Sequence, residues 1–302
     1  MTFALFCKSF RGDISRFARL LASAERHGPE VRFVLSVPRS DRALFLDRFG
    51  TGRFELLLDE ELIGREIPQS WRAQQLVKLY AGRAAFADAW LVVDSDGYFV
   101  RPFGESDFTS ADGSVALVAT PLLHLLDTEW ESVVRYLDDV RAAPLPSAAE
   151  LRAGPRPALR RPPLWQRWVD ALRRPSAEAH LDRIQRFFGR SGPVLNFMPA
   201  PVWTRTSLAT LESDLLEPLR LRFEDLIAFA PWEGVWVGEW ELYRGLPGRH
   251  VMHPSLLHVG SDDAISRARK TGLTEAQIAR RYSGLVLAAR HQSIETLDIG
   301  SP

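Results

Sequence analysis

The sequence predicts an α/β fold in which helices flank a mainly parallel central sheet. Short apolar runs alternate with helical patterns through residues 3–140, and strands that are separated by helices usually lie parallel in one sheet. The chain has 302 residues, of which 46% are apolar and 25% are charged, so it can bury a large core. We therefore expect a single domain over 1–302.

Four apolar runs in the first third of the chain predict strands. They are Phe3–Cys7, Val31–Val37, Phe54–Leu58 and Ala89–Val93. The second run places its apolar residues at period two, as a strand does. Helices are expected between the runs: one opened by Asp13 and stopped by Gly28, one over 41–49, and one from Ser70 to about Ala87.

The rest of the chain adds a strand, two helices and a segment of unusual composition. A strand is expected at 115–120 and a helix at 127–142, opened by a capping box. From 141 to 190, eleven arginines and seven prolines stand against four acidic residues. We interpret this segment as a basic, partly helical insertion or lid. A last helix is expected at 273–292, opened by a second capping box.

Composition excludes several classes of partner and location. The 38 basic and 38 acidic residues give a formal net charge of zero, whereas a general nucleic-acid binder carries a strong basic excess. Because Cys7 is the one cysteine, no intrachain disulfide can form, and a cytoplasmic location is expected. No apolar run approaches the ~18 residues of a membrane span. Trp165 and Trp168 beside arginines leave peripheral membrane contact open.

Two aspartates form the most informative motif. Asp94 and Asp96 directly follow the apolar strand at Ala89–Val93, and in such sheets ligands bind at the carboxyl ends of the strands. Two carboxylates there can hold Mg²⁺ or Mn²⁺, which prefer oxygen ligands and share positions with phosphate oxygens. Such a metal offsets the charge on a departing diphosphate. A loop in which the acids cap backbone amides is the structural alternative.

Two enzyme classes use an apolar strand followed by this motif. In nucleotide-sugar glycosyltransferases of the GT-A fold, the acids bind metal and diphosphate. In haloacid-dehalogenase-like phosphatases, Asp94 would be the phosphoryl-accepting nucleophile, and the pair Asp262 and Asp263 fits a late acidic motif of that class. The phosphatase motif normally lies on the first strand, however, and here 93 residues precede it. A non-catalytic nucleotide-sugar binder is a third alternative.

Several segments together resemble one family. "ALFCKSFRGDISRFARLLASAERH", "SVPRSD", "SWRAQQLVKL" and "LVVDSDGYFVRPF" are similar, in this order, to a largely uncharacterised bacterial family related to GT-A glycosyltransferases. Pro199–Leu211 and Glu239–Gly245 look like the acceptor-half motifs of the same family. Gly97 departs from the pattern, because Ser or another polar residue is expected there.

The resemblance implies a GT-A-like domain with four parts. These are a nucleotide-binding half over 1–140, the insertion over 141–190, an acceptor half over 191–260 and a helical C-terminal tail over 261–302. The implied reaction moves a sugar from a nucleotide-diphosphate-sugar, most simply a UDP- or GDP-sugar, to an unknown glycan, lipid or small-molecule acceptor. Mn²⁺ or Mg²⁺ is the implied cofactor.

The resemblance also implies the donor and metal residues. The donor residues are Cys7, Lys8, Ser9, Arg11, Arg72, Gln75, Lys78 and Asp94; the metal ligands are Asp94, Asp96 and His258. The spacing of three puts Arg72, Gln75 and Lys78 on one helix face, where a solvated polar stripe is an equal alternative. His253 is a second candidate for the late metal ligand.

An inverting transfer needs a carboxylate base to take the proton of the acceptor hydroxyl. The resemblance implies Glu239 as this base. Glu241 lies two residues further and is an alternative, and Asp225 and Glu233 also stay open. A retaining mechanism needs no such base, and the sequence does not decide the stereochemistry. The tryptophans of the acceptor half are expected to serve packing first, with one or two at most contacting substrate.

Overall fold

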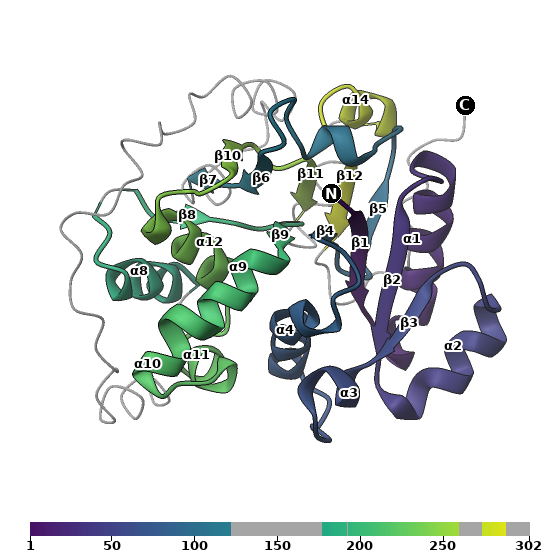
Figure 1. Ribbon diagram of the computed structural model, residues 1–302. Helices are drawn as coiled ribbons and strands as arrows, with labels where there is room; N and C mark the ends of the chain where they lie inside the picture. The colour runs from purple at the N-terminus through teal and green to yellow at the C-terminus, as the bar shows by residue number, and fades with distance from the viewer. Residues whose placement is uncertain (122–176, 192, 260–273, 288–302) are drawn as a thin grey trace.

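A five-stranded sheet organises the first half of the chain (Figure 1). The computed structural model describes residues 1–121, 177–191, 193–259 and 274–287. The strands are β1 (Phe3–Lys8), β2 (Arg32–Val37), β3 (Glu55–Leu58), β4 (Ala89–Val92) and β9 (Val202–Thr204), in the order β3-β2-β1-β4-β9. All neighbours pair in parallel except β4 and β9. The predicted α/β fold with a mainly parallel sheet is confirmed.

Both faces of this sheet are buried, because successive side chains of a strand point to opposite faces. In β1, Leu5 and Cys7 join one core cluster, whereas Ala4 and Phe6 join another. On the first face pack α1 (Ile14–His27) and α2 (Arg42–Phe49), and on the second packs α4 (Trp71–Tyr80), preceded by α3 (Asp59–Ile63). The expected third helix therefore ends as an α-helix at Tyr80, and a 3₁₀ turn (Ala81–Ala84) follows it.

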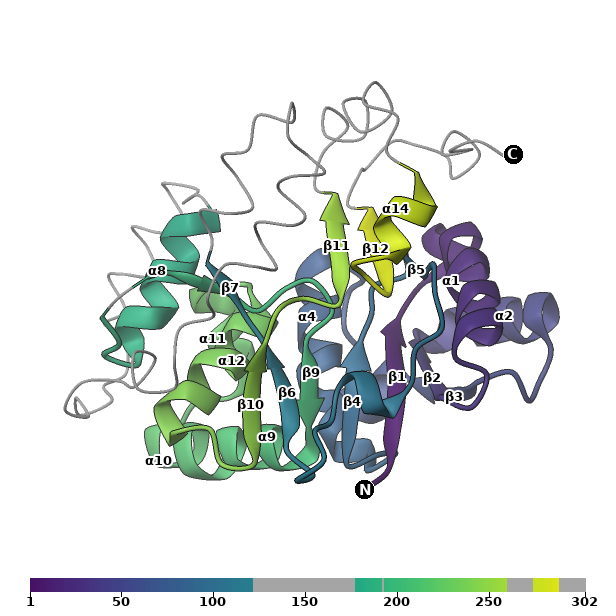
Figure 2. The same ribbon diagram turned by 90° about the horizontal axis from the view of Figure 1, so that it is seen from above.

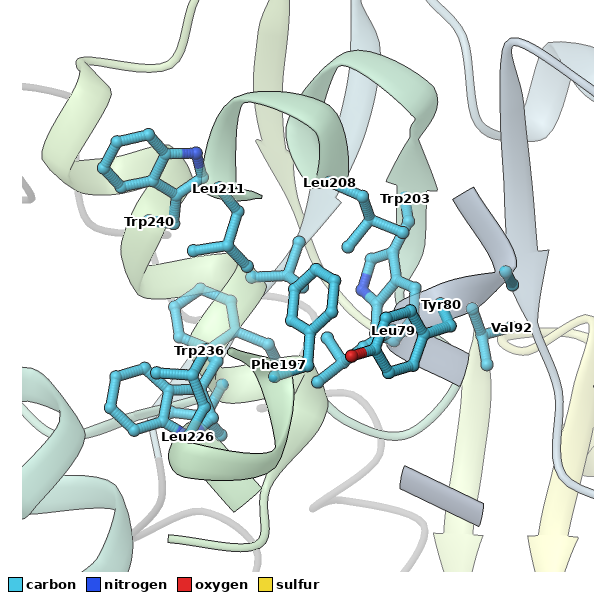
Figure 3. Packing of buried hydrophobic residues seen from close by; sticks show 14 of the residues in the cluster. Leu79, Tyr80, Val92, Phe197, Trp203, Leu208, Leu211, Leu226, Trp236 and Trp240 are labelled. Atoms are coloured by element: carbon cyan, nitrogen blue, oxygen red, sulfur yellow. The ribbon is translucent and has the colours of Figure 1, made fainter. Parts of the chain in front are cut away.

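The second half of the chain packs helices against α4 and β4. These helices are α8 (Ala177–Phe187), α9 (Arg205–Thr210), α10 (Glu217–Leu219), α11 (Phe223–Phe229) and α12 (Glu233–Arg244). Trp203, Trp236 and Trp240 lie in the core with Phe197, as Figure 3 shows. These tryptophans serve packing, as expected from their bulk. Gly238 is required here, because a Cβ would come within 2.2 Å of the Phe197 ring.

A two-stranded sheet of β6 (Val115–Val118) and β10 (Arg249–Met252) lies beside β9 (Figure 2), and β7 (Thr120–Pro121) and β8 (Leu195–Asn196) form a second two-stranded sheet. β6 pairs in parallel with β10, and β7 pairs with β8. The buried guanidinium of Arg249 donates to the carbonyls of Ala116 and Val202 at 2.8 and 2.6 Å. It thereby joins β6 to β9 through a side chain. The strand predicted at 115–120 is present.

The C-terminal segment differs from the predicted long helix. The capping box of Thr274 and Gln277 is present, but the helix it opens, α14, covers only Glu275–Ala279. Gly284–Leu287 form a strand, β12, between β11 (Leu256–Val259) and β5 (Gly97–Phe99). A short apolar run fits either structure, and here the open edges of β5 and β11 decide. The helix prediction is therefore wrong over residues 280–287, where the described part of this segment ends.

Several predicted features lie outside the described residues. They are the helix at 127–142, the insertion up to 176 with Trp165 and Trp168, and the acids Asp262 and Asp263. The described end of the insertion forms the helix α8. Among the helices that the structure describes, none is long and apolar enough to cross a membrane.

Candidate functional site

The candidate site lies at the carboxyl ends of β1 and β4. After β1 the chain builds β2 and β3 on one side and then returns to add β4 on the other side. The strand order reverses at this point, which is where open α/β sheets bind ligands. β1 ends with Cys7 and Lys8, and β4 leads directly into Asp94. Burial and then the charge of Asp94 raise the pKa of Cys7, so the two predicted segments are neighbours.

Asp94 is held by a buried lysine. Its Oδ1 lies 2.6 Å from Nζ of Lys78, and the same Nζ lies 2.9 Å from Oε1 of Glu233. The side chains of Lys78 and Glu233 are each 2% exposed, whereas that of Asp94 is 34% exposed. Burial opposes the charge on Lys78, but Asp94 and Glu233 outweigh it and raise its pKa well above the usual value. The ammonium therefore stays charged, and Asp94 is the member of the group whose side chain remains partly exposed.

Asp96 is in the opposite situation. Its Oδ1 is buried and has no hydrogen-bond partner. Burial, and then the charge of Asp94, raise the pKa of Asp96 to about 7. An unpaired buried carboxylate costs free energy of folding, and such a group in a crevice is a functional-site candidate.

Asp96→Asn is expected to stabilise the protein above pH 7 when metal is removed. Because the pKa rises in the folded state from an ordinary 3.8 to about 7, wild-type stability should fall as the pH rises through this interval and stay low above it. Asparagine carries no charge, so the stability of the variant should not fall for this reason as the pH rises. Urea unfolding in EDTA at pH 8 and pH 4 measures the difference. A variant less stable than wild type at pH 8 would contradict the unpaired state of Asp96.

The loop between the two aspartates is tied to α1. Ser95 donates its hydroxyl to Oδ2 of Asp13 at 3.0 Å, and Arg16 lies 3.4 Å from Oδ1 of the same residue. Asp13 occupies the predicted N-cap position of α1, but its side chain makes no capping hydrogen bond. It serves the site loop instead of the helix end.

β12 closes over the other side of this loop. The amide of Leu287 donates to the carbonyl of Asp96 at 3.3 Å, and Val286 pairs with Gly97. A Cβ on Gly97 would lie 2.8 Å from Val93 Cγ1 and 3.1 Å from the Asp94 carbonyl. The glycine that departs from the expected polar residue is therefore explained by lack of space.

The aromatic residue after Gly97 links the loop to α14 and α1. The hydroxyl of Tyr98 donates to Glu275 at 3.1 Å, and the guanidinium of Arg19 lies 3.8 Å from the centre of the Tyr98 ring. Arg19 also donates to the carbonyl of Asp96 at 3.4 Å. The backbone of Asp96 is thus held from α1 and from the C-terminal segment, while its Oδ1 stays without a partner.

The predicted donor residues of the first strand and its loop are mostly engaged within the protein. Lys8 is fully buried and lies 2.9 Å from Asp59, so its charge is already paired. Arg11 donates to Asp41 from its backbone and its Nε, both at 2.7 Å. Cys7 and Ser9 are buried, and the hydroxyl of Ser9 has no hydrogen-bond partner. Their roles in donor binding stay predictions.

Of the three residues predicted to share one face of α4, two are buried and one is exposed, and their part in donor binding stays a prediction. Gln75 and Lys78 are buried and turn toward the start of α12, where Gln75 accepts the amide of Glu233 at 3.4 Å. Arg72 is exposed. Trp71 is 52% exposed and meets Trp232 edge to face, with ring centres 6.1 Å apart.

His258 lies on β11. Burial lowers the pKa of His258, and the negative charge of Asp94 acts in the opposite direction, so the two groups interact electrostatically. Within the described part of the chain, no three or more His, Cys, Asp or Glu side chains stand close enough together to hold a metal ion. The two aspartates nevertheless fit Mg²⁺ or Mn²⁺, which need few protein ligands when water and phosphate complete the shell. The part of His258 stays a prediction.

Glu239 is engaged in a buried ion pair. Arg190 approaches it with two nitrogens, at 2.7 and 2.5 Å, and both side chains are 1% exposed. Burial raises the pKa of Glu239 and Arg190 opposes this. A base role for Glu239 stays a prediction that requires the pair to open. Because α12 is a helix, Glu241 lies on a different face and cannot simply replace it.

Glu233 is the acid of the acceptor half that the structure brings to the site. Glu233 was one of several open candidates for the base. Its position in the first turn of α12 is the one local feature that distinguishes it from the other acids of this helix. Its partner Lys78 lies 155 residues away in the sequence, so the pairing has no sequence pattern.

Comparisons with known proteins add no family. No family model matches the chain, and a search of curated proteins finds no significant match. Any functional conclusion therefore depends on the chemistry of Asp94, Asp96 and their neighbours, together with the resemblance described above.

Proposed function

We propose that the protein is a glycosyltransferase that moves a sugar from a nucleotide-diphosphate-sugar to an acceptor with the help of Mg²⁺ or Mn²⁺. One observation carries the proposal. Asp96 keeps a buried carboxylate oxygen without a partner, beside Asp94 and at the point where the strand order reverses. A divalent cation with a diphosphate would supply the missing partner.

The residues of the site have distinct parts in this proposal. Asp96 and the free oxygen of Asp94 would hold the cation, which when bound offsets charge on the departing diphosphate. Lys78 fixes the other oxygen of Asp94 at 2.6 Å. The loop is kept in place by Asp13 through Ser95 and by β12. In this proposal the donor would lie at the carboxyl edge of the strands, and α12 would lie on the acceptor side.

The first test is calorimetry with UDP, GDP, dTDP and CMP, each with and without Mn²⁺. We expect one of the diphosphates or CMP to bind in a Mn²⁺-dependent manner. Asp96→Asn should weaken this binding at least tenfold, because a neutral amide oxygen attracts a divalent cation less strongly than a charged carboxylate does. Asp47→Asn, the same change at an exposed position of α2, is the matched control and should bind like wild type.

A different outcome would favour the phosphatase alternative. If no nucleotide binds and the protein hydrolyses an aryl phosphate, with the activity lost in Asp94→Asn, the proposal is wrong. Binding of a nucleotide without transfer or slow hydrolysis of any of its sugar derivatives would instead leave a non-catalytic binder.

A further inference from the structure

Lys78 joins carboxylates from two distant parts of the chain. Asp94 follows β4 in the first half, and Glu233 opens α12 in the second half. The Lys78 Nζ lies 2.6 Å from the first and 2.9 Å from the second. Gln75, one turn earlier on α4, accepts the backbone amide of Glu233. The contact between α4 and α12 thus ends directly at the candidate donor site.

Burying the charges of Lys78 and Glu233 costs free energy of folding. Removing charges from water costs several kcal/mol per ion, and well-packed apolar residues of similar volume are often as stable or more stable. Lys78 and Glu233 are each 2% exposed, so packing alone does not account for them. Their partner Asp94 is the accessible member, at 34% exposed. The buried pair therefore acts on the one carboxylate that can meet a ligand.

The net charge of Lys78, Asp94 and Glu233 also matters for the attraction of a cation. Lys78 alone would neutralise Asp94 and weaken its attraction for a cation. Glu233 adds a second negative charge on the same ammonium, so the three groups together carry one negative charge. Asp94 is therefore anchored by Lys78 without the group losing its attraction for a metal–diphosphate. A neutral hydrogen-bond donor in place of Lys78 and Glu233 would likewise leave one negative charge at Asp94.

We propose that Lys78 and Glu233 are positioning residues of the donor site, with Lys78 fixing one oxygen of Asp94 and Glu233 fixing Lys78. The inference rests on the proposed function, since it needs a nucleotide and a cation at Asp94. It adds that α12, from the acceptor side, helps to set donor affinity. Trp71 and Trp232, which meet on the same side of α4, extend this contact to the surface.

The decisive variant replaces both members of the buried pair by apolar residues. Lys78→Met/Glu233→Leu keeps the volume, so it is expected to unfold at a urea concentration close to that of wild type. Its affinity for the nucleotide found by calorimetry, measured with Mn²⁺, should nevertheless fall at least tenfold, because Asp94 has lost its anchor. Glu233→Gln, which leaves Asp94 and Asp96 unchanged, should weaken binding severalfold, because an amide holds the Lys78 ammonium less strongly than a carboxylate does.

The controls separate this inference from the proposed function. If wild type binds none of the nucleotides with Mn²⁺, the proposed function fails and the inference with it. If wild type binds but both variants bind equally well, the positioning role alone is wrong. Should the double variant not fold, Glu233→Gln still decides. A double-mutant cycle of Lys78→Met with Asp94→Asn should show that the two losses of affinity do not add.

Discussion

Replacing Glu239 by Gln should lower the free energy of unfolding by about 3–5 kcal/mol, the cost of breaking a buried ion pair from one side. The guanidinium of Arg190 would lose its countercharge and one of the two acceptor oxygens that it now contacts, while its bond to the carbonyl of Pro193, at 2.9 Å, remains. Both side chains are 1% exposed, so water cannot replace the missing countercharge. Urea unfolding measures the loss.

One further variant and one control show whether the missing countercharge of Arg190 causes the loss of stability. Arg190→Met/Glu239→Leu removes both charges and should recover most of the stability. Glu178→Gln, at an exposed position of α8, should stay within about 0.5 kcal/mol of wild type. If Glu239→Gln unfolds like wild type but loses transfer activity, the ion pair is not structural, and the base role implied by the sequence regains support.

The ion pair of Glu239 shows how far a sequence motif can assign a role to a single residue. The segment around Glu239 resembles an acceptor-half motif, but its carboxylate anchors the residue that ends the Arg/Pro-rich segment. Glu233, six residues earlier and without a distinguishing pattern, is the acid linked to Asp94 through Lys78. A local motif identifies the helix, whereas the partner of each acid depends on contacts between distant parts of the chain.

The elements that the sequence predicted well are those fixed by local pattern. The strands β1, β2 and β4 are apolar runs whose two faces are both buried, β3 is partly buried, and the helices between them carry one apolar face. The position of Asp94 and Asp96 at a carboxyl edge follows from this order. The sequence did not show that Lys8 is neutralised by Asp59, because the two are brought together only by the ends of β1 and β3, which lie on either side of β2 in the sheet.

The C-terminal segment shows the limit of local pattern. "GLVL" at Gly284–Leu287 was predicted as the continuation of a helix, but it pairs with β5 and β11. Four apolar residues carry no period that separates helix from strand. What decides is the presence of two strands with free edges, one of them the continuation of the aspartate loop. Gly284, which weakens a helix, was the one local sign.

Gly284→Ala is expected to disturb both the fold and the site. A Cβ on Gly284 would lie 2.3 Å from the carbonyl oxygen of Tyr98 and 3.2 Å from Cα of Phe99. Because these are backbone atoms of β5, the strands themselves must separate. Overpacking of this kind costs about 1–3 kcal/mol. It should also release the bond from Leu287 to Asp96, so we expect Mn²⁺-dependent nucleotide binding to fall at least tenfold.

Hydrogen exchange locates the damage. The amides of 97–99 and 284–287 should exchange faster in Gly284→Ala, while those of β1 and β2 should keep their protection, because the strain is confined to one pair of strands. Gly104→Ala is the matched control, since a Cβ there meets nothing within 4 Å. If Gly284→Ala binds nucleotide like wild type while β5 and β12 exchange fast, Asp96 is held by Arg19 and Ser95 alone. A coincident loss of protection and binding would make the C-terminal strand part of the donor site.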